Sequence, residues 1–373
     1  MEFYKTMMFK KIINIPIMIA LLLALYGPFI AANVAAEMTS EIIGSWPLEQ
    51  RKPFNQKIQS HTPVRYQPLK SANKPWRLCV LVPHLKDAYW MGINYGLVRH
   101  AKALNLQLEL FEAGSYYADD KQLAQLDHCM RQNFDGILLG AVSPELLFQY
   151  QPPLTKPIIA LVNRLNSPKV KTRIGVNWYE MGYNAGQFVR QNTATDATLA
   201  ILAGPNKQGG SEFVEQGLIA ALENSFIKVS AIQHADNNRN LYRDQLEILL
   251  RSQQPDYILG SAVAIEAAVS VLRQKGLTDQ IQLVSSYLSP AILRAVHRKK
   301  VEFSNDDFVV IQGQLAIDIL VRELEGASAF GDIGPEIQGL QDKDINSSSL
   351  KDSLAPADYY PVYQVISNQV ISD

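Results

Sequence analysis

Aromatic residues at the ends of predicted strands are the side chains of this sequence with the clearest chemical use. Tyr89 and Trp90 follow the first predicted strand of the globular part. Trp178 lies where the chain passes from a first set of predicted elements to a second, and Tyr287 follows a strand of the second set. Because the face of an aromatic ring attracts positive charge, rings from two walls of one cleft predict a box for a cation or a dipolar amine. For any single ring, packing in a core or stacking on a sugar is the alternative.

Two polar residues at strand ends, Asp87 and Asn163, are further candidates for the same site. The Asp87 carboxylate is suited to oppose a positive nitrogen, and an amide is suited to donate to a ligand oxygen. The alternative for Asp87 is a structural one, the N-cap of a helix that begins near Tyr89. Too few charged groups accompany these two to satisfy the hydroxyls of a sugar, because buried polar groups must be paired.

Local signatures of common enzymes are missing from the sequence. It has no His-Glu-x-x-His, no Gly-x-Ser-x-Gly and no Gly-Lys-Ser/Thr. Of the six histidines only His84 lies beside the predicted cleft, and a loop histidine is usually a solvated polar residue. The glycine-rich turn at 204–211 fits either an anion-binding loop or a tight strand-to-helix connection. We therefore expect a protein that is not an enzyme and has no cofactor and no metal site.

Short apolar runs alternate with amphipathic stretches from residue 75 onward, which is typical of parallel sheets covered by helices. The predicted strands are 78–82, 107–112, 136–139, 157–162, 198–202, 228–234, 256–259, 282–285 and 301–304. The predicted helices are 89–104, 119–133, 181–191, 212–223, 241–252, 265–273 and 308–325. This order predicts two doubly wound parallel-sheet α/β lobes, with a ligand cleft at the carboxyl ends of their strands.

These elements also predict the domain organisation. We expect a first lobe of residues 75–175 plus 306–326 and a second lobe of residues 176–305 plus 327–373. Residues 37–74 are polar, carry four prolines and show no sustained period, so an N-terminal extended arm is expected there.

The first 36 residues have the three parts of a secretory signal. Basic residues precede an apolar stretch, and Val34-Ala35-Ala36 is a small-residue cleavage site. We expect cleavage before Glu37 and no stable membrane insertion afterwards. The alternative is an uncleaved anchor, which Pro16 and Pro28 disfavour because proline interrupts helices.

Charge and cysteine content narrow the class of protein further. The 373 residues carry 35 Lys+Arg against 36 Asp+Glu, and no long basic run. That balance excludes the usual electrostatic footprint of a protein that binds nucleic acid. The only two cysteines, Cys79 and Cys129, predict one disulfide in an exported chain, the alternative being two buried thiols.

Several stretches of the sequence resemble the TorT family of periplasmic proteins, which sense trimethylamine N-oxide together with the histidine kinase TorS. The resemblance covers about residues 76–363 and leaves the leader and the arm uncovered. The matching stretches are Leu-Lys-Asp-Ala-Tyr-Trp at 85–90, Asn-Tyr-Gly at 94–96, Arg-Ile-Gly-Val at 173–176, Trp178 with Met-Gly-Tyr at 181–183, Gly-Pro at 204–205, Gly-Gly-Ser at 209–211, 262–268, Tyr-Leu-Ser at 287–289 and Pro-Val-Tyr at 361–363. Both cysteines also fall where the family has them.

This resemblance implies a type I periplasmic binding protein fold, with two lobes joined by three crossovers around the ligand cleft. It also implies that Trp90, Trp178 and Tyr287 form an aromatic site for trimethylamine N-oxide, with Tyr89 close by. One departure is Asn177, which stands where the family is expected to have Pro and predicts a looser hinge.

The resemblance further implies a function and a partner. The expected protein is a periplasmic sensor that acts on the periplasmic sensor domain of a TorS-like histidine kinase in a two-component system. The alternative is a periplasmic solute-binding protein that delivers a sugar or a quaternary amine to an ABC transporter. The two hypotheses share the fold and the compartment and differ in the partner.

Overall fold

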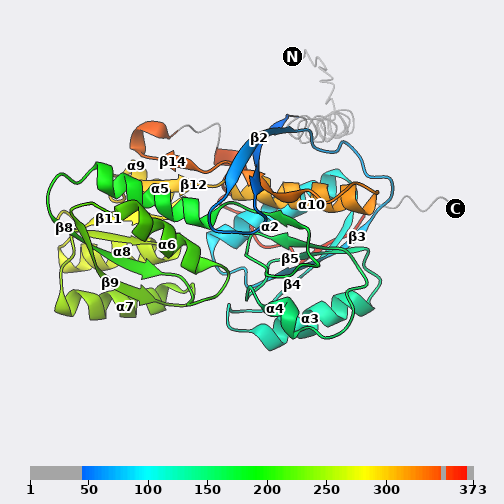
Figure 1. Cartoon of the computed structure of the whole chain (residues 1–373), viewed down its shortest axis with the longest axis horizontal. Coiled ribbons are helices and arrows are strands. Elements are labelled where there is room, and N and C mark those ends of the chain that lie inside the picture. Colours follow the sequence, from blue (N-terminus) through cyan, green and yellow to red (C-terminus); the bar gives the residue numbers. More distant parts are fainter. Residues whose placement is uncertain (1–43, 346–349, 368–373) are drawn as a thin grey trace, which may run out of the picture. The chain divides into compact units, whose positions relative to one another are not determined.

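Two α/β sheets organise the chain, as the sequence predicts (Figure 1). The structure is a computed structural model that describes residues 44–345 and 350–367. Both sheets belong to one compact unit, which begins at Ser45. The expected signal peptide at 1–36 lies outside the described residues, and so does the beginning of the expected arm. Within the described ranges no helix is long and apolar enough to cross a membrane.

The first lobe is built on a nine-stranded sheet with the order β15-β4-β3-β5-β6-β7-β13-β1-β2. Its parallel centre consists of buried apolar runs, which is typical of a sheet covered on both faces. The strands are β1 (Trp46–Lys52), β2 (Ser60–Tyr66), β3 (Arg77–Val82), β4 (Gln107–Glu112), β5 (Gly136–Leu139), β6 (Ile158–Leu161), β7 (Thr172–Ile174), β13 (Gly331–Pro335) and β15 (Gln364–Val365).

Helices cover the first sheet in two groups that belong to different hydrophobic clusters. Helices α2 (Ala88–Ala103) and α10 (Val309–Leu324) share one cluster, and α3 (Asp119–Arg131) and α4 (Leu146–Gln149) share another. The late helix α10 therefore returns to the first lobe, as expected. It packs closely on α2 because glycines stand at the crossing: a Cβ on Gly96 would lie 2.1 Å from the carbonyl oxygen of Val310.

The second lobe is built on a six-stranded sheet with the order β14-β12-β11-β10-β8-β9. Its strands are β8 (Ala197–Ala203), β9 (Ile227–His234), β10 (Tyr257–Gly260), β11 (Gln282–Ser285), β12 (Phe303–Asp306) and β14 (Gln338–Leu340). Its helices are α5 (Trp178–Gln191), α6 (Ser211–Leu222), α7 (Arg239–Ser252), α8 (Ala262–Lys275) and α9 (Pro290–His297). Helices α5 and α6 are also in close contact, since a Cβ on Gly182 would lie 1.9 Å from the carbonyl oxygen of Val214.

Three short segments connect the lobes in the way that the resemblance implies. They lie between β7 and α5, between β12 and α10, and between β13 and β14. A fourth passage follows, because β14 lies in the second sheet and β15 returns to the first. More than one segment therefore joins the two lobes, and we call these connecting segments hinge segments.

The expected extended arm at 37–74 is wrong in its described part. Residues 46–66 form the β1–β2 hairpin, in which Trp46 pairs with Tyr66 and Lys52 pairs with Ser60. The hairpin joins the first sheet through β13, so the first lobe begins well before residue 75. The sequence shows no apolar-polar alternation here because two buried positions of β1 hold charged side chains. Glu49 and Arg51 pair with each other, and Arg51 also pairs with Asp332.

The assignment of 327–373 to the second lobe is also wrong in part. Strand β13 pairs with β7, and β15 pairs with β4, so both lie in the first sheet. Only β14 joins the second sheet, antiparallel to β12. Strands of five, three and two residues show no period of their own, and contacts far away in the sequence decide where they pair.

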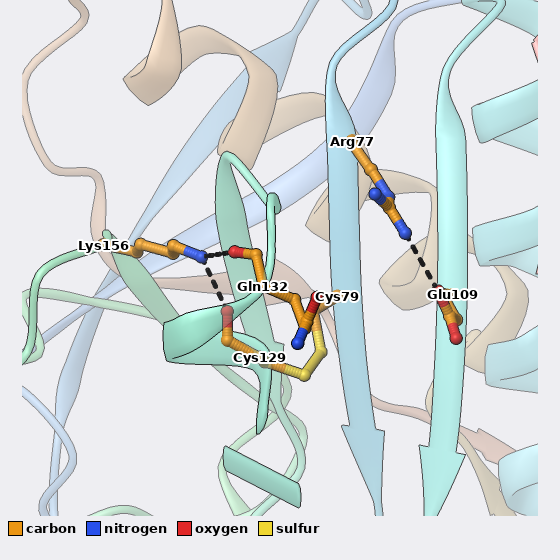
Figure 2. Close-up of a disulfide and its surroundings, with 6 residues drawn as sticks. All are labelled: Arg77, Cys79, Glu109, Cys129, Gln132 and Lys156. Atoms are coloured by element: carbon orange, nitrogen blue, oxygen red, sulfur yellow. Dashed lines mark hydrogen bonds and ion pairs between the residues drawn. A yellow bond between two sulfur atoms is a disulfide. The ribbon is translucent and has the colours of Figure 1, made fainter. Parts of the chain in front are cut away.

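The predicted disulfide is present. Cys79 on β3 and Cys129 on α3 are bonded, and both side chains are fully buried (Figure 2). The backbone oxygen of Cys129 also accepts a hydrogen bond from Lys156 Nζ at 2.7 Å. The bond therefore joins β3, an interior strand of the first sheet, to a helix on one of its faces.

Candidate functional site

A cavity of about 90 Å³, measured as the space open to the centres of water molecules, lies between the two lobes. The first lobe lines it with residues that follow β3, β4 and β6, and the second lobe with residues from α5 and α6 and from the ends of β8, β10 and β11. These are mainly carboxyl ends of parallel strands, where α/β sheets bind ligands. In the described part of the chain, the charged residues in this lining are both acidic, Asp87 and Glu215.

Five aromatic side chains line the cavity: Tyr89, Trp90, Tyr116, Trp178 and Tyr287. The structure thus brings together the four aromatic residues that the sequence predicted. Tyr89 of the first lobe meets Tyr287 of the second edge to face, with ring centroids 5.1 Å apart and planes at 80°. Tyr116 was missed, although it follows β4 in Gly114-Ser115-Tyr116 and the same rule of aromatic residues after strands would have found it.

Asp87 lines the cavity and has the structural role considered for it, while its role toward a ligand stays a prediction. Its Oδ1 accepts a hydrogen bond from the backbone N–H of Trp90 at 2.9 Å, which makes it the N-cap of α2. Its Oδ2 accepts a hydrogen bond from Asn237 Nδ2, which also donates to the Tyr287 hydroxyl at 3.3 Å. Burial raises the pKa of Asp87. Asp87 therefore orients Trp90 and also links the two lobes at the cavity.

Tyr89 is held from behind by a buried carboxylate. Its hydroxyl donates to Asp307 Oδ2 at 2.7 Å, and Gln312 Nε2 donates to the same oxygen at 3.0 Å. Asp307 belongs to the crossover between β12 and α10. Burial, which outweighs these hydrogen bonds, raises the pKa of Asp307 to about 7. This contact, which no sequence pattern indicated, joins a cavity residue to a hinge segment.

Trp178 is the first residue of α5, and its position depends on the residue before it. The Oδ1 atom of Asn177 accepts hydrogen bonds from the backbone N–H groups of Tyr179 at 3.0 Å and Glu180 at 3.4 Å, so Asn177 is the N-cap. Its Nδ2 donates to the backbone oxygen of Lys57 at 3.1 Å. These bonds fasten the hinge at the position where the absence of Pro predicted a looser one.

Asn163 is not among the residues that line the cavity, so its expected role in ligand binding stays a prediction. It is fully buried, and its Nδ2 donates to the backbone oxygen of Ala141 at 2.7 Å. The amide is used to join the chain segments that follow β5 and β6. A strand-end position therefore placed Asn163 near the cleft without directing its side chain into the cavity.

The other candidates have structural explanations. His84 is buried rather than solvated, and its ring meets that of Tyr116 with centroids 5.4 Å apart. Gly209 and Gly210 have φ of 63° and 103°, which only glycine adopts readily, so the tight connection explains the glycines of the turn at 204–211. Within residues 44–345 and 350–367 no cluster of His, Cys, Asp and Glu is suited to hold a metal ion.

Sequence comparisons place the chain among periplasmic proteins. The family described as periplasmic binding protein domain matches residues 78–328. The periplasmic protein TorT of Escherichia coli K12 is 33% identical over 82% of this chain and 88% of its own length. TorT of Escherichia coli O157:H7 is 34% identical over 82% of this chain and 89% of its own length.

Solved structures agree with the sequence comparisons. A complex of TorT with the TorS sensor domain, determined in the presence of TMAO, contains a chain that is 34% identical, with a TM-score of 0.70 over 77% of this chain and 99% of the other. An ABC transporter solute-binding protein from Bradyrhizobium sp. BTAi1 with bound bis-tris is 29% identical, with a TM-score of 0.72 over 85% and 98%. Fold, family match and identity together show that this chain belongs to the TorT family of periplasmic binding proteins.

Proposed function

We propose that the chain binds trimethylamine N-oxide in the cavity between its lobes and regulates a TorS-like histidine kinase. One observation carries the proposal: five aromatic rings from both lobes surround one small cavity. Its lining in the described residues contains acidic groups and no basic side chain. This combination suits a small molecule with a positively polarised nitrogen.

The chemistry of the cavity matches the two ends of trimethylamine N-oxide. The methylated nitrogen carries positive charge, and each desolvated ring face contributes up to about 2 kcal/mol to binding such a group. The oxygen needs a hydrogen-bond donor. Trp178 Nε1 is buried and has no hydrogen-bond partner among the described residues, so it is available to a ligand that enters beside this ring.

The size of the cavity supports a ligand of a few non-hydrogen atoms. On the same measure a single water molecule needs about 10 to 15 Å³. The 90 Å³ of this cavity therefore exceeds the space for one water several times over. The surface that the lining exposes to the cavity is mainly apolar, which disfavours a sugar because each buried hydroxyl needs a partner.

The proposed action on the kinase follows from the lining of the cavity by both lobes. A ligand shifts an equilibrium between two conformations only by its different affinities for them. Contacts from both walls provide that difference, because they are made together only in one arrangement of the lobes. The solved complexes of TorT with the TorS sensor domain support the same partner class here. In this proposal the protein acts by binding its ligand and its partner, and it catalyses no reaction.

Calorimetric titration of the chain from Glu37 onward tests the ligand. We expect saturable binding of trimethylamine N-oxide, and no binding of glycine betaine or ribose. Binding of ribose alone would overturn the proposal and favour a sugar-delivering protein. The partner is tested by sedimentation of the chain with the periplasmic sensor domain of the kinase, with and without the N-oxide, and failure to associate in both conditions contradicts the sensor function.

A second candidate function is delivery of an amine or a sugar to an ABC transporter. The observation that favours it is the similarity to the Bradyrhizobium solute-binding protein, which was solved with bis-tris, an amine. The sedimentation experiment separates the two functions, since a transport protein has no reason to bind the kinase. Titration with bis-tris shows in addition whether the cavity accepts a larger amine.

Replacing Trp178 by Ala should weaken binding of trimethylamine N-oxide about 5-fold to 30-fold, because a desolvated ring face contributes about 1 to 2 kcal/mol. Trp76→Ala is the matched control, because Trp76 is a partly exposed tryptophan outside the cavity lining. Calorimetry of both variants measures the change. Equal affinities of Trp178→Ala and the wild type would remove Trp178 from the binding site.

A further inference from the structure

The N-terminal hairpin lies outside the part of the chain that the family description matches, yet it is bound to the hinge. The match covers residues 78–328, whereas β1 and β2 span 46–66. Strand β1 pairs with β13 in the register Arg51 to Asp332 and Glu49 to Gly334. Strand β13 leads directly into the crossover to β14. The hairpin is therefore adjacent to a segment along which the lobes are connected.

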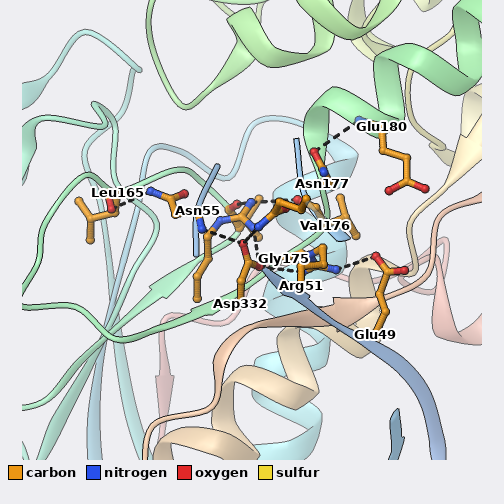
Figure 3. Close-up of polar contacts among 12 residues, drawn as sticks. Glu49, Arg51, Asn55, Leu165, Gly175, Val176, Asn177, Glu180 and Asp332 are labelled. Atoms are coloured by element: carbon orange, nitrogen blue, oxygen red, sulfur yellow. Dashed lines mark hydrogen bonds and ion pairs between the residues drawn. The ribbon is translucent and has the colours of Figure 1, made fainter. Parts of the chain in front are cut away.

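Arg51 of the hairpin is a fully buried charge that contacts one crossover and the strand that leads into another (Figure 3). Its Nη2 donates to the backbone oxygen of Gly175, in the crossover between β7 and α5, at 2.5 Å. The same nitrogen donates to Asp332 Oδ1 at 2.9 Å, and Asp332 lies in β13, the strand that leads into the crossover to β14. Its Nη1 donates to Glu49 Oε1 at 3.0 Å. One guanidinium thus joins the crossover between β7 and α5 and strand β13 to the hairpin.

The crossover between β7 and α5 also touches strand β13 next to Arg51. A Cβ on Gly334 would lie 1.8 Å from the backbone oxygen of Gly175 and 3.3 Å from Arg51 Nη2. Any side chain at position 334 would therefore clash with the backbone at Gly175, so this close approach requires glycine. The Arg51 guanidinium lies next to this contact and donates a hydrogen bond to the same Gly175 oxygen.

Charge pairing makes this contact selective for arginine. Asp332 accepts hydrogen bonds from Arg51 and also from Arg173 Nη1 at 3.0 Å, and all three side chains are buried. Although burial opposes it, the two guanidinium groups hold the pKa of Asp332 below its ordinary value. A neutral side chain at position 51 leaves Glu49 without this partner and the Gly175 carbonyl without this donor, and buried polar groups are costly when unpaired.

The loop of the hairpin extends the same contact toward the cavity. Gln59 Nε2 donates to Asp332 Oδ2 at 2.9 Å, and the backbone oxygen of Lys57 accepts from Asn177 Nδ2 at 3.1 Å. Asn177 is the N-cap that precedes Trp178, and Trp178 lines the ligand cavity. A chain of direct contacts therefore runs from the hairpin through the hinge segment to the cavity.

We propose that Arg51 is a positioning residue of the ligand cavity: by binding Gly175 and Asp332 together it fixes the hinge segment that presents Trp178 and the angle between the lobes. The ligand-affinity part of this inference rests on the proposed function, and the lobe-angle part does not. The hairpin is then part of the hinge of the binding protein and not an appended arm.

The test compares Arg51→Met with Arg65→Met. Arg65 is exposed on β2 of the same hairpin, so the control makes the same substitution away from the hinge. Spin labels on Ala124→Cys of α3 and Asp244→Cys of α7, both exposed positions, report the distance between the lobes. The labels attach specifically because the two native cysteines are bonded to each other.

In the absence of ligand, we expect a broader or shifted distance distribution for Arg51→Met and an unchanged one for Arg65→Met. With trimethylamine N-oxide, calorimetry should show about 5-fold to 30-fold weaker binding for Arg51→Met, since misplacing Trp178 removes about as much as deleting a ring face. If Arg51→Met lowers only the urea midpoint while distances and affinity match the control, its role is merely structural and the inference is wrong.

A milder variant keeps the inference testable if Arg51→Met does not fold. Asn177→Ser retains an N-cap oxygen for α5 but lacks the amide that reaches Lys57. We expect weaker ligand binding and a changed distance between the lobes in this variant also. Wild-type values for both the affinity and the distance would overturn the proposal. If the wild-type chain does not bind the N-oxide at all, the proposed function fails, while the distances measured without ligand still decide the lobe-angle part.

Discussion

Between about pH 4 and about pH 8 the free energy of unfolding should fall about 4 kcal/mol further in the wild-type chain than in Asp307→Asn. Asp307 is buried, and its pKa is raised from 3.8 to about 7. In that interval the folded chain holds a proton that the unfolded chain has lost. Stability from this group is therefore complete below about pH 4 and is lost as the pH rises through about 7. A shift of about three pKa units, at about 1.4 kcal/mol each, gives the magnitude.

Asparagine removes the titration while it conserves the shape of the side chain. Its amide oxygen is able to accept the hydrogen bonds that Tyr89 and Gln312 now donate to Asp307. Urea unfolding at a series of pH values measures the difference, and Asp358→Asn, at an exposed position, is the control. Other shifted carboxyl groups cancel in the comparison with the wild type. Parallel stability curves for the wild type and Asp307→Asn would show that Asp307 does not titrate in this interval.

Loss of the disulfide should lower the free energy of unfolding by roughly 4 kcal/mol, because the bond closes a loop between positions 50 residues apart. The double variant Cys79→Ala with Cys129→Ala tests this in urea. The first lobe should account for the change, because both cysteines lie in it. Neither cysteine lines the cavity, so affinity for trimethylamine N-oxide in the folded variant should stay within about twofold of the wild type.

The reduced wild-type chain separates the bond from the two side chains. It keeps both sulfur atoms in the core and loses only the cross-link, so it should unfold at nearly the same urea concentration as the double variant. An oxidised wild type that is no more stable than the reduced chain would contradict the stabilising role. Oxidised and reduced samples of Asp307→Asn should show the same difference, because the two predicted effects arise at separate places in the fold.

Regular elements with strong local patterns were predictable from the sequence. The strands β3, β4, β5 and β11 and the helices α2 and α10 match their predicted ranges within one residue, because apolar runs and helical periods are local properties. The aromatic residues of the cavity were predictable for a similar reason. They lie in the loops or at the helix starts that follow strands, and parallel strands bring their carboxyl ends to one edge of a sheet.

Residues whose environment depends on distant partners were not predictable in this way. Asn163 was expected in the cavity, and its side chain donates to Ala141. Tyr116 lines the cavity although no argument singled it out, and Asp307 holds Tyr89 from a segment 218 positions away. In each case the residue type and the strand-end position were visible, but the direction of the side chain was set by packing between elements.

The sequence by itself determined the α/β class, the disulfide and the aromatic character of the site, because periodicity, cysteine count and residue type are properties of the chain alone. Tertiary structure decided that residues 46–66 form a hairpin and that Arg51 is buried at the hinge. A charged residue is read from sequence as exposed, since burying an unpaired charge is costly. Only the fold supplies Asp332, 281 positions away, as the partner that makes its burial stable.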